Sequence, residues 1–123
     1  MIKLVYCIRR RPDVPAETFH AYWLNEHGPK VRAVAKTIRA RRYVQSHTSS
    51  PELNDVFRQS RGLAPAYDGI TEIWWDSEVD LLAGTESEEG IAAAKLLLED
   101  EASFIDFSQS TIFMTVEHEI FDL

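Results

Sequence analysis

The chain begins with Ile2-Lys3-Leu4-Val5-Tyr6-Cys7-Ile8-Arg9, a stretch rich in aliphatic and β-branched residues. Successive side chains of a strand point to opposite faces of the sheet. Here the even-numbered positions are apolar, and Val5 and Cys7 add apolar side chains to the other face. The pattern predicts a strand that is covered on both faces.

Three further strands are predicted along the chain. Residues 41–48 alternate in the manner of a strand, and residues 70–76 form a short run with Trp74 and Trp75 on opposite faces. Residues 111–121 close the chain as the fourth strand. Each of these strands carries side chains that need cover on both faces.

Helical spacing fills the two longer intervals between the strands. In residues 15–39 the apolar stripe is interrupted at Gly28-Pro29, which predicts that one helix stops there and that a second begins. Residues 77–106 also read as two helical pieces, with Gly84 and Gly90 marking the break.

The connection between residues 49 and 67 is long for so small a domain. It predicts a short surface helix with Ser50 as N-cap, Pro51 in the first turn and Gly62 as terminator. Connections of this length are often functional.

The order of elements is therefore strand-helix-strand, strand-helix-strand. An α+β, ferredoxin-like βαββαβ fold with a four-stranded antiparallel sheet accommodates this order, in a single domain over residues 1–123. Its helices cover one face of the sheet only. We expect a second copy of the chain to cover the other face, which predicts a homodimer.

Composition narrows the range of partners. The 123 residues include 13 Lys and Arg against 20 Asp and Glu, for a net charge of -7. This excess of acidic residues argues against a nucleic-acid partner, because the phosphate backbone demands a basic surface. The basic residues gather in residues 1–62, and we expect the basic stretch 30–39 to complement acidic clusters at 86–89 and 99–101, within or between protomers.

The sequence shows no sign of export or membrane insertion. The N-terminal apolar run is short and leads directly into three arginines, unlike a signal peptide. The apolar stretch 91–98 is broken by Lys95 and is too short to span a bilayer. With a single cysteine, which excludes an internal disulfide, these features predict a cytoplasmic protein without membrane contact.

The densest candidate for chemistry is the segment Tyr22-Trp23-Leu24-Asn25-Glu26-His27-Gly28-Pro29. His27 follows Trp23 by four residues and shares its side of the predicted helix, so its imidazole could sit beside an aromatic-lined cavity. Histidine titrates near neutral pH and suits a general acid or base. The alternative is a histidine that caps the last carbonyls of a helix.

Tyr43 and His47 form a second candidate pair. They lie four residues apart on a predicted strand and therefore share a face. A tyrosine and a histidine facing one cavity could polarise an oxygen atom and exchange its proton, as cofactor-free isomerisation or cyclisation requires. The alternative is a polar end of a sheet with ordinary hydrogen bonds.

The aromatic residues suggest a pocket for a small hydrophobic molecule. Large apolar side chains are core by default, yet three tryptophans exceed what so small a core needs. We expect the substrate-binding residues to include Tyr22, Trp23, His47, Trp75 and Phe113. The four histidines lack metal-binding spacing and no phosphate or dinucleotide motif is present, so no metal or cofactor is predicted.

At these residues the sequence resembles the EthD-domain proteins, over nearly the whole chain. The strongest single piece is the tryptophan followed by His27-Gly28-Pro29. The segments that carry the resemblance are residues 2–12, 22–29, 41–47, 68–77 and 113–118.

The resemblance implies a dimeric α+β barrel of ferredoxin-like protomers. It also implies an association with oxidative ether breakdown beside a monooxygenase system, and the wider superfamily includes cofactor-free isomerases, cyclases and monooxygenases as well as haem enzymes. A methylmuconolactone isomerase is similar in having a histidine where His27 stands and a tyrosine where Tyr43 stands. Its active-site cysteine falls where this chain has Ile73. The resemblance therefore implies that Ile73 is a further substrate-binding residue, and the missing cysteine sets the two reactions apart.

These observations favour an EthD-like protein that acts on an aromatic, lactone, ether-derived or polyketide-like metabolite. In this interpretation His27 is the general acid or base and Tyr43 orients or protonates a substrate oxygen. The reaction is either cofactor-free isomerase or cyclase chemistry or a step in an oxidoreductase pathway. The alternative is a non-catalytic metabolite-binding protein or an accessory protein of a partner oxygenase, because binding and catalytic pockets use the same aromatic residues.

Overall fold

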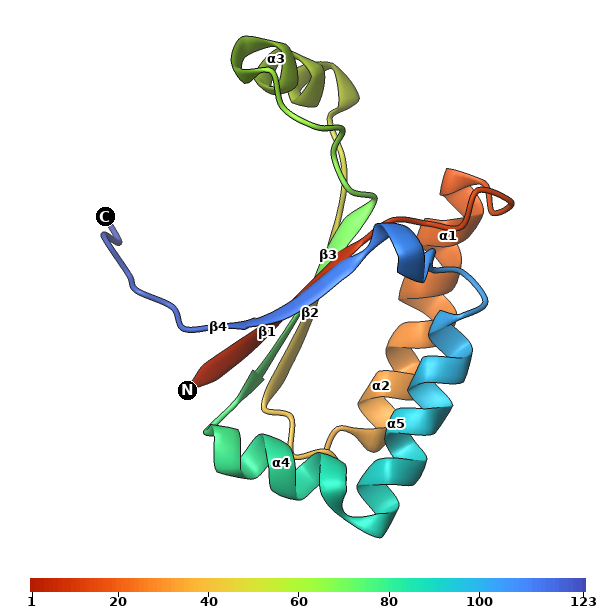
Figure 1. Cartoon of the computed structure of the whole chain (residues 1–123), viewed down its shortest axis with the longest axis vertical. Helices are drawn as coiled ribbons and strands as arrows, with labels where there is room; N and C mark the ends of the chain where they lie inside the picture. Colours follow the sequence, from red (N-terminus) through yellow and green to blue (C-terminus); the bar gives the residue numbers. More distant parts are fainter.

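A computed structural model describes all residues, 1–123. Its centre is a four-stranded antiparallel sheet in the order β2-β3-β1-β4 (Figure 1). The strands are β1 (Ile2–Ile8), β2 (Arg42–His47), β3 (Gly69–Trp75) and β4 (Thr111–Thr115). This is the strand order of a ferredoxin-like βαββαβ fold, as the sequence predicts.

The register of β1 against β3 decides which side chains meet the helices. Ile2 lies opposite Trp75 and Ile8 opposite Gly69, so the even-numbered positions of β1 share a face with the odd-numbered positions of β3. The helices lie along that face (Figure 1). Trp74 points to the other face, which confirms that the two neighbouring tryptophans face opposite sides.

The first helical segment does not stop at Gly28-Pro29, contrary to the sequence prediction. Helix α1 (Ala16–Tyr22) passes through a π-helical turn, η1 (Trp23–His27), directly into α2 (Gly28–Val34). Gly28 keeps right-handed helical angles, and its N–H reaches back five residues to the Trp23 carbonyl. The wider turn accommodates the proline at a point where an α-helix would lose a hydrogen bond.

Helix α3 (Pro51–Arg61) stands away from the sheet and its helix layer (Figure 1). It begins after Ser50 and ends at Gly62, whose φ of 63° is the left-handed conformation that glycine tolerates. The helix is as predicted, but the Ser50 side chain makes no capping hydrogen bond. At the base of this excursion the Thr48 N–H donates to the Asp68 carbonyl at 3.0 Å.

The second helical segment divides into α4 (Glu78–Glu86) and α5 (Glu88–Glu101). The break lies at Ser87, between the two predicted glycines, and the Ser87 hydroxyl caps α5 by accepting the Gly90 N–H at 3.0 Å. A short 3-10 turn, η2 (Phe107–Gln109), leads into β4. Gly84 lets the backbones approach, since a Cβ there would lie 2.2 Å from the Ile38 carbonyl oxygen.

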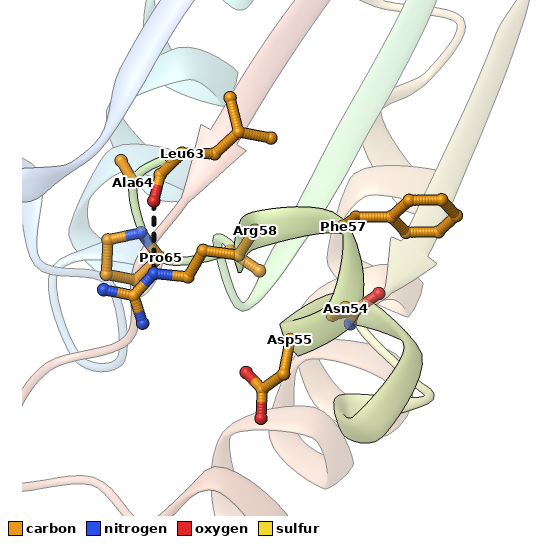
Figure 2. Close-up of a pocket in the computed structure, with 8 residues that line it drawn as sticks. Asn54, Asp55, Phe57, Arg58, Leu63, Ala64 and Pro65 are labelled. Atoms are coloured by element: carbon orange, nitrogen blue, oxygen red, sulfur yellow. Dashed lines mark hydrogen bonds between the residues drawn. The ribbon is translucent and has the colours of Figure 1, made fainter. Parts of the chain in front are cut away.

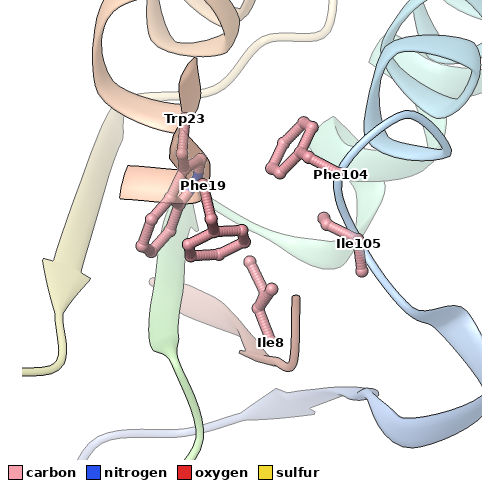
Figure 3. Packing of buried hydrophobic residues seen from close by; sticks show 5 residues of the cluster. All are labelled: Ile8, Phe19, Trp23, Phe104 and Ile105. Atoms are coloured by element: carbon pink, nitrogen blue, oxygen red, sulfur yellow. The ribbon is translucent and has the colours of Figure 1, made fainter. Parts of the chain in front are cut away.

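The core between sheet and helices has two parts. The larger cluster, drawn in Figure 3, joins β1 to α1, η1 and the end of the second helical segment. Its buried members are Ile8, Phe19, Trp23, Phe104 and Ile105. The smaller cluster contains Ile38, Trp75 and Ala93. Burying each of the larger side chains contributes about 1.5–3 kcal/mol, so these residues fix the helix layer on the sheet.

The opposite face of the sheet carries no helix. Lys3 and Glu72 form an ion pair across it at 2.7 Å, and the Trp74 indole donates to Glu117. Strand β4 is shorter than predicted and ends at Thr115. Thr115 pairs with Lys3, and β1 begins only one residue before Lys3, so β1 offers almost no further backbone for a longer β4 to pair with. Beyond Glu117 the remaining residues, 118–123, extend away from the sheet (Figure 1).

None of the helices combines the length and the apolar character needed to cross a membrane.

We expect Gly84→Ala to destabilise the protein. Alanine is favoured over glycine in a helix by about 1 kcal/mol. Here, however, its Cβ would meet a backbone carbonyl at 2.2 Å, which cannot rotate away. We expect the free energy of unfolding, measured by urea denaturation, to fall by about 2 kcal/mol.

Gly62→Ala is the matched control for this substitution. No atom lies within 4 Å of a Cβ at position 62, so only its left-handed backbone is strained, at a cost of about 1–2 kcal/mol. A Gly84→Ala protein as stable as the wild type would show that the α4 backbone does not pack this closely on Ile38.

Candidate functional site

A cavity of about 50 Å³ lies between the sheet and the helix layer. The sheet contributes Tyr6, Tyr43 and Thr71 to its lining, and the helices contribute Trp23, His27 and Glu101. Most of the remaining lining is aliphatic, including Ile73. A few polar groups in an apolar cavity are typical of a small-molecule site.

His27 is held in this cavity by Asp100 of α5. Its Nδ1 lies 2.7 Å from the Asp100 carboxylate, and the two side chains are only 7% and 9% exposed. A carboxylate can only accept, so the Nδ1 of His27 carries the hydrogen. In the neutral imidazole the Nε2 atom is then an unprotonated acceptor. It has no hydrogen-bond partner in the protein, yet it is not sealed from solvent-sized molecules.

Asp100 is itself surrounded by donors. Lys30 Nζ lies 2.8 Å from its Oδ1, and the Tyr22 hydroxyl donates to the same oxygen. Burial acts to raise the pKa of Asp100, but the hydrogen bonds from Lys30, Tyr22 and His27 hold that pKa below its usual value. The carboxylate therefore stays charged at neutral pH.

Burial lowers the pKa of His27 below its ordinary value. The hydrogen bond and charge of Asp100 act in the opposite direction, and nearby Lys30 adds to the lowering. His27 is consequently neutral at physiological pH. The tautomer set by Asp100 presents a basic nitrogen, as a general base requires.

Tyr43 lines the same cavity and is oriented by Gln45. The Gln45 amide nitrogen donates to the Tyr43 hydroxyl oxygen at 2.9 Å and to the Trp23 carbonyl at 2.8 Å. Burial raises the pKa of Tyr43, so its hydroxyl keeps its hydrogen. Because the Tyr43 oxygen accepts from Gln45, that hydrogen remains available to a ligand in the cavity.

His47 does not line the cavity, although the sequence pattern placed it with Tyr43. Its Nε2 bonds to the Gln45 carbonyl oxygen at 2.8 Å, and its Nδ1 lies 2.8 Å from the Nδ1 of His20. Both ring nitrogens are therefore occupied within the protein. Its ring lies against Trp23, with 4.3 Å between the ring centroids. His47 supports Trp23 and Gln45 from behind the cavity.

Three other predicted binding residues also lie outside the lining. Tyr22 is engaged with Asp100. Trp75 belongs to the smaller core cluster and donates to the Ile38 carbonyl at 2.8 Å. Phe113 lies on the opposite face of the sheet, half exposed, because its register partner is Val5. Of the predicted set, His27, Tyr43, Trp23 and Ile73 meet at the cavity.

Glu101 is a lining residue that the sequence interpretation missed. Burial raises its pKa to about 7, with the Tyr6 hydroxyl opposing the shift and Asp100 adding to it. For the acidic run 99–101 the sequence predicts only charge complementarity with the basic stretch 30–39. A signal was nevertheless present, because Leu97, Glu101 and Ile105 follow one another at a spacing of four residues and all line the cavity.

A larger hollow of about 280 Å³ lies beside α3 (Figure 2). Its labelled side chains include Asp55, Phe57 and Arg58, and the Arg58 guanidinium donates to the Leu63 carbonyl at 3.1 Å. All three of these side chains are exposed. The hollow holds no buried titratable group, so the chemistry is concentrated in the smaller cavity. The structure contains no group of three or more His, Cys, Asp or Glu side chains placed to hold a metal ion.

Comparison with known proteins gives a family match and several structural neighbours. The family model described as EthD domain matches residues 11–108. No curated protein matches the chain. An ethyl tert-butyl ether D (EthD) family protein from Bacillus halodurans superposes with a TM-score of 0.62 at 20% identity, over 96% of this chain and 99% of the other.

Two further solved structures share the fold. A dimeric protein of unknown function with a ferredoxin-like fold, from Bacteroides fragilis, gives a TM-score of 0.57 at 16% identity, with 93% of each chain covered. SnoaB from Streptomyces nogalater, a cofactor-independent oxygenase, gives 0.56 at 8% identity, over 96% of this chain and 93% of the other.

We expect the Asp100→Asn substitution to lower the pKa of His27 further. The wild-type pKa already lies below the ordinary value because of burial, and the Asp100 charge is what opposes that effect. ¹⁵N-NMR titration of the histidine side chains measures the pKa directly. The same spectra should show neutral wild-type His27 with its hydrogen on Nδ1.

Asp106→Asn is the control, because Asp106 has no contact with His27 and caps η2 instead. It should leave the His27 pKa unchanged. If Asp100→Asn and Asp106→Asn gave the same His27 pKa as the wild type, Asp100 would not be setting the state of the imidazole.

Proposed function

The chain belongs to the EthD domain family, and we propose that it catalyses a cofactor-free proton transfer on a small hydrophobic molecule bound between its sheet and its helices. In this proposal His27 is the general base and Tyr43 is the donor that orients a substrate oxygen. The reaction class is an isomerisation, cyclisation or related step that begins with removal of a proton.

The observation that carries this proposal is the state of His27. Its Nδ1 is committed to Asp100, while its Nε2 has no partner in the protein. A histidine held by a buried carboxylate on one nitrogen is prepared to take a proton on the other. The carboxylate also stabilises the imidazolium that forms, since it remains charged beside the ring.

Tyr43 complements this base from the sheet. Its hydroxyl hydrogen is free, and Gln45 holds the oxygen in place. A hydrogen bond from a neutral hydroxyl stabilises negative charge that develops on a substrate oxygen. A base on the helix side and a donor on the sheet side are together sufficient for proton transfer without a metal or an organic cofactor.

The size of the cavity sets a condition on binding. A volume of about 50 Å³ is enough for one or two water molecules at roughly 30 Å³ each. An aromatic, lactone or polyketide-like substrate therefore requires the lining to move apart. The apolar lining is suited to such a molecule. SnoaB, a neighbour in fold, is a cofactor-independent oxygenase, which supports cofactor-free chemistry on this architecture.

We also propose that the protein is a homodimer. The sheet face without helices carries half-exposed Phe113, and large apolar side chains also project from α3 and from the C-terminal residues. The neighbour from Bacteroides fragilis is dimeric. A second copy would cover these side chains, which include Val56, Phe57, Phe113, Ile120 and Phe121.

Replacing His27 tests the proposed chemistry. We expect His27→Gln to reduce turnover of aromatic and lactone substrates by at least about 100-fold, because general-base catalysis contributes at least that much. Ligand-induced thermal stabilisation should persist, since the apolar lining is retained. His118→Gln, in the exposed C-terminal segment, is the control and should retain full turnover.

If His27→Gln turned over substrate as fast as the wild type, the catalytic role of His27 would be refuted. Binding without turnover by the wild type would instead favour a metabolite-binding or accessory protein.

Replacing Phe113 tests the dimer. We expect the wild type to sediment with the mass of two chains at micromolar concentration, and Phe113→Glu to shift this equilibrium towards one chain, because it places a charge on the face to be covered. Val79→Glu is the control, since Val79 is 75% exposed at the start of α4 on the helix side. Equal dimerisation by all three proteins would exclude this face as the interface.

A further inference from the structure

Glu101 is a titratable group of the cavity that the proposed mechanism does not use. It sits one residue after Asp100, at the end of α5, yet its carboxylate faces a different set of groups. Asp100 accepts hydrogen bonds from three donors and stays charged. Burial is the main influence on Glu101, and only the Tyr6 hydroxyl opposes it as a hydrogen-bond partner. Two neighbouring carboxylates therefore have opposite environments.

The groups that face Glu101 come from every element around the cavity. Tyr6 projects from β1, Tyr43 from β2 and His27 from η1, and Asp100 precedes it on α5. None of them supplies a positive charge to Glu101 at neutral pH, because His27 is neutral and Lys30 is bonded to Asp100. Without a positive partner in an apolar lining, a carboxyl group favours its protonated form.

We propose that Glu101 is a further catalytic residue of this cavity, the acid that gives a proton to the carbonyl oxygen of the substrate while His27 removes a proton from the adjacent carbon. The inference rests on the proposed function and specifies its substrate class, a carbonyl compound with a hydrogen on the neighbouring carbon, such as a lactone or a cyclic ketone. Its basis is that a base and an acid line one small cavity from two neighbouring elements, His27 from η1 and Glu101 from α5.

The step balances without an added reactant. The C–H bond breaks, its proton goes to His27 Nε2, and its electron pair forms the C=C bond of an enol. The carbonyl π electrons take the proton of the Glu101 carboxyl group, which leaves a carboxylate. The reverse transfer, to the same carbon or to another carbon of the conjugated system, restores both side chains and gives exchange or isomerisation.

The environments of the two groups match these roles. With a pKa of about 7, roughly half of the Glu101 side chains carry a proton at pH 7, whereas an ordinary glutamate would have lost it. His27, with its pKa lowered, is already a free base in the same range. Activity should fall below neutral pH as His27 becomes protonated, and above about pH 7 as Glu101 ionises.

The test uses the full-length protein and exchange of the α-hydrogens of cyclohexanone and γ-butyrolactone in deuterium oxide, followed by ¹H-NMR between pH 5 and 9. For the wild type we expect a bell-shaped dependence of the exchange rate. Glu101→Gln keeps the size of the side chain but cannot donate an acidic proton. Its maximal rate should fall about 100-fold, and the loss of rate above pH 7 should disappear.

Glu99→Gln is the matched control, because Glu99 is an exposed carboxylate on the same helix. It should keep the wild-type profile. A ¹³C-NMR titration of the glutamate carboxyl carbons gives a second readout that needs no substrate, and Glu101 should titrate near pH 7.

The outcomes separate the two proposals. Wild-type exchange by Glu101→Gln with an unchanged alkaline limb, together with loss of exchange in His27→Gln, would overturn the role of Glu101 and leave the proposed function standing. Wild-type exchange by His27→Gln would overturn the proposed function itself. No exchange by the wild type on either probe would overturn both, and a Glu101 signal titrating near pH 4.5 would overturn the inference alone.

Discussion

The site depends on one carboxylate, Asp100, that joins the end of α5 to the π-helical turn of the first helical segment. It accepts hydrogen bonds from Tyr22, His27 and Lys30, which all lie within nine residues of one another in the first helical segment. A single buried charge thus aligns two helices and fixes the tautomer of the histidine between them. Without it, His27 would be a buried imidazole with an unsatisfied Nδ1–H and no reason to present a basic nitrogen to the cavity.

The architecture could be predicted from the sequence because it rests on alternation and helical spacing. Residues 2–9 carry apolar side chains on both faces, and Trp74 and Trp75 point to opposite faces. These patterns predict strands whose two faces must both be covered, and the structure confirms the antiparallel sheet and its helix layer. Local exceptions were harder. Gly28-Pro29 ordinarily ends a helix, and only tertiary packing shows that a π-helical turn carries the chain through it.

The site was predictable only in part, for a related reason. Helical spacing grouped His27 with Trp23, the period of a strand singled out Tyr43, and the family resemblance added Ile73; all four line the cavity. Glu101 lay within an acidic run and His47 shared a face with Tyr43, yet the first is in the cavity and the second is behind it. Spacing along the sequence predicts the direction in which a side chain points. Whether Glu101 and His47 reach the cavity depends on the tertiary contacts that each side chain makes. Charge is a similar case, because the sequence does not show which charged residues meet. In the structure the basic first half contacts the acidic second half within one protomer, through the ion pairs Lys30–Asp100 and Arg39–Asp80.

The excursion that carries α3 is closed at its base by the hydrogen bond from Thr48 to Asp68, before the chain returns to β3. The pairing of β2 with β3 therefore does not depend on what lies between residues 49 and 67. Because surface connections tolerate changes in length, a shorter or longer segment here is compatible with the register that aligns Tyr43 with the cavity. The cavity and the α3 appendage are thus structurally independent parts of one domain.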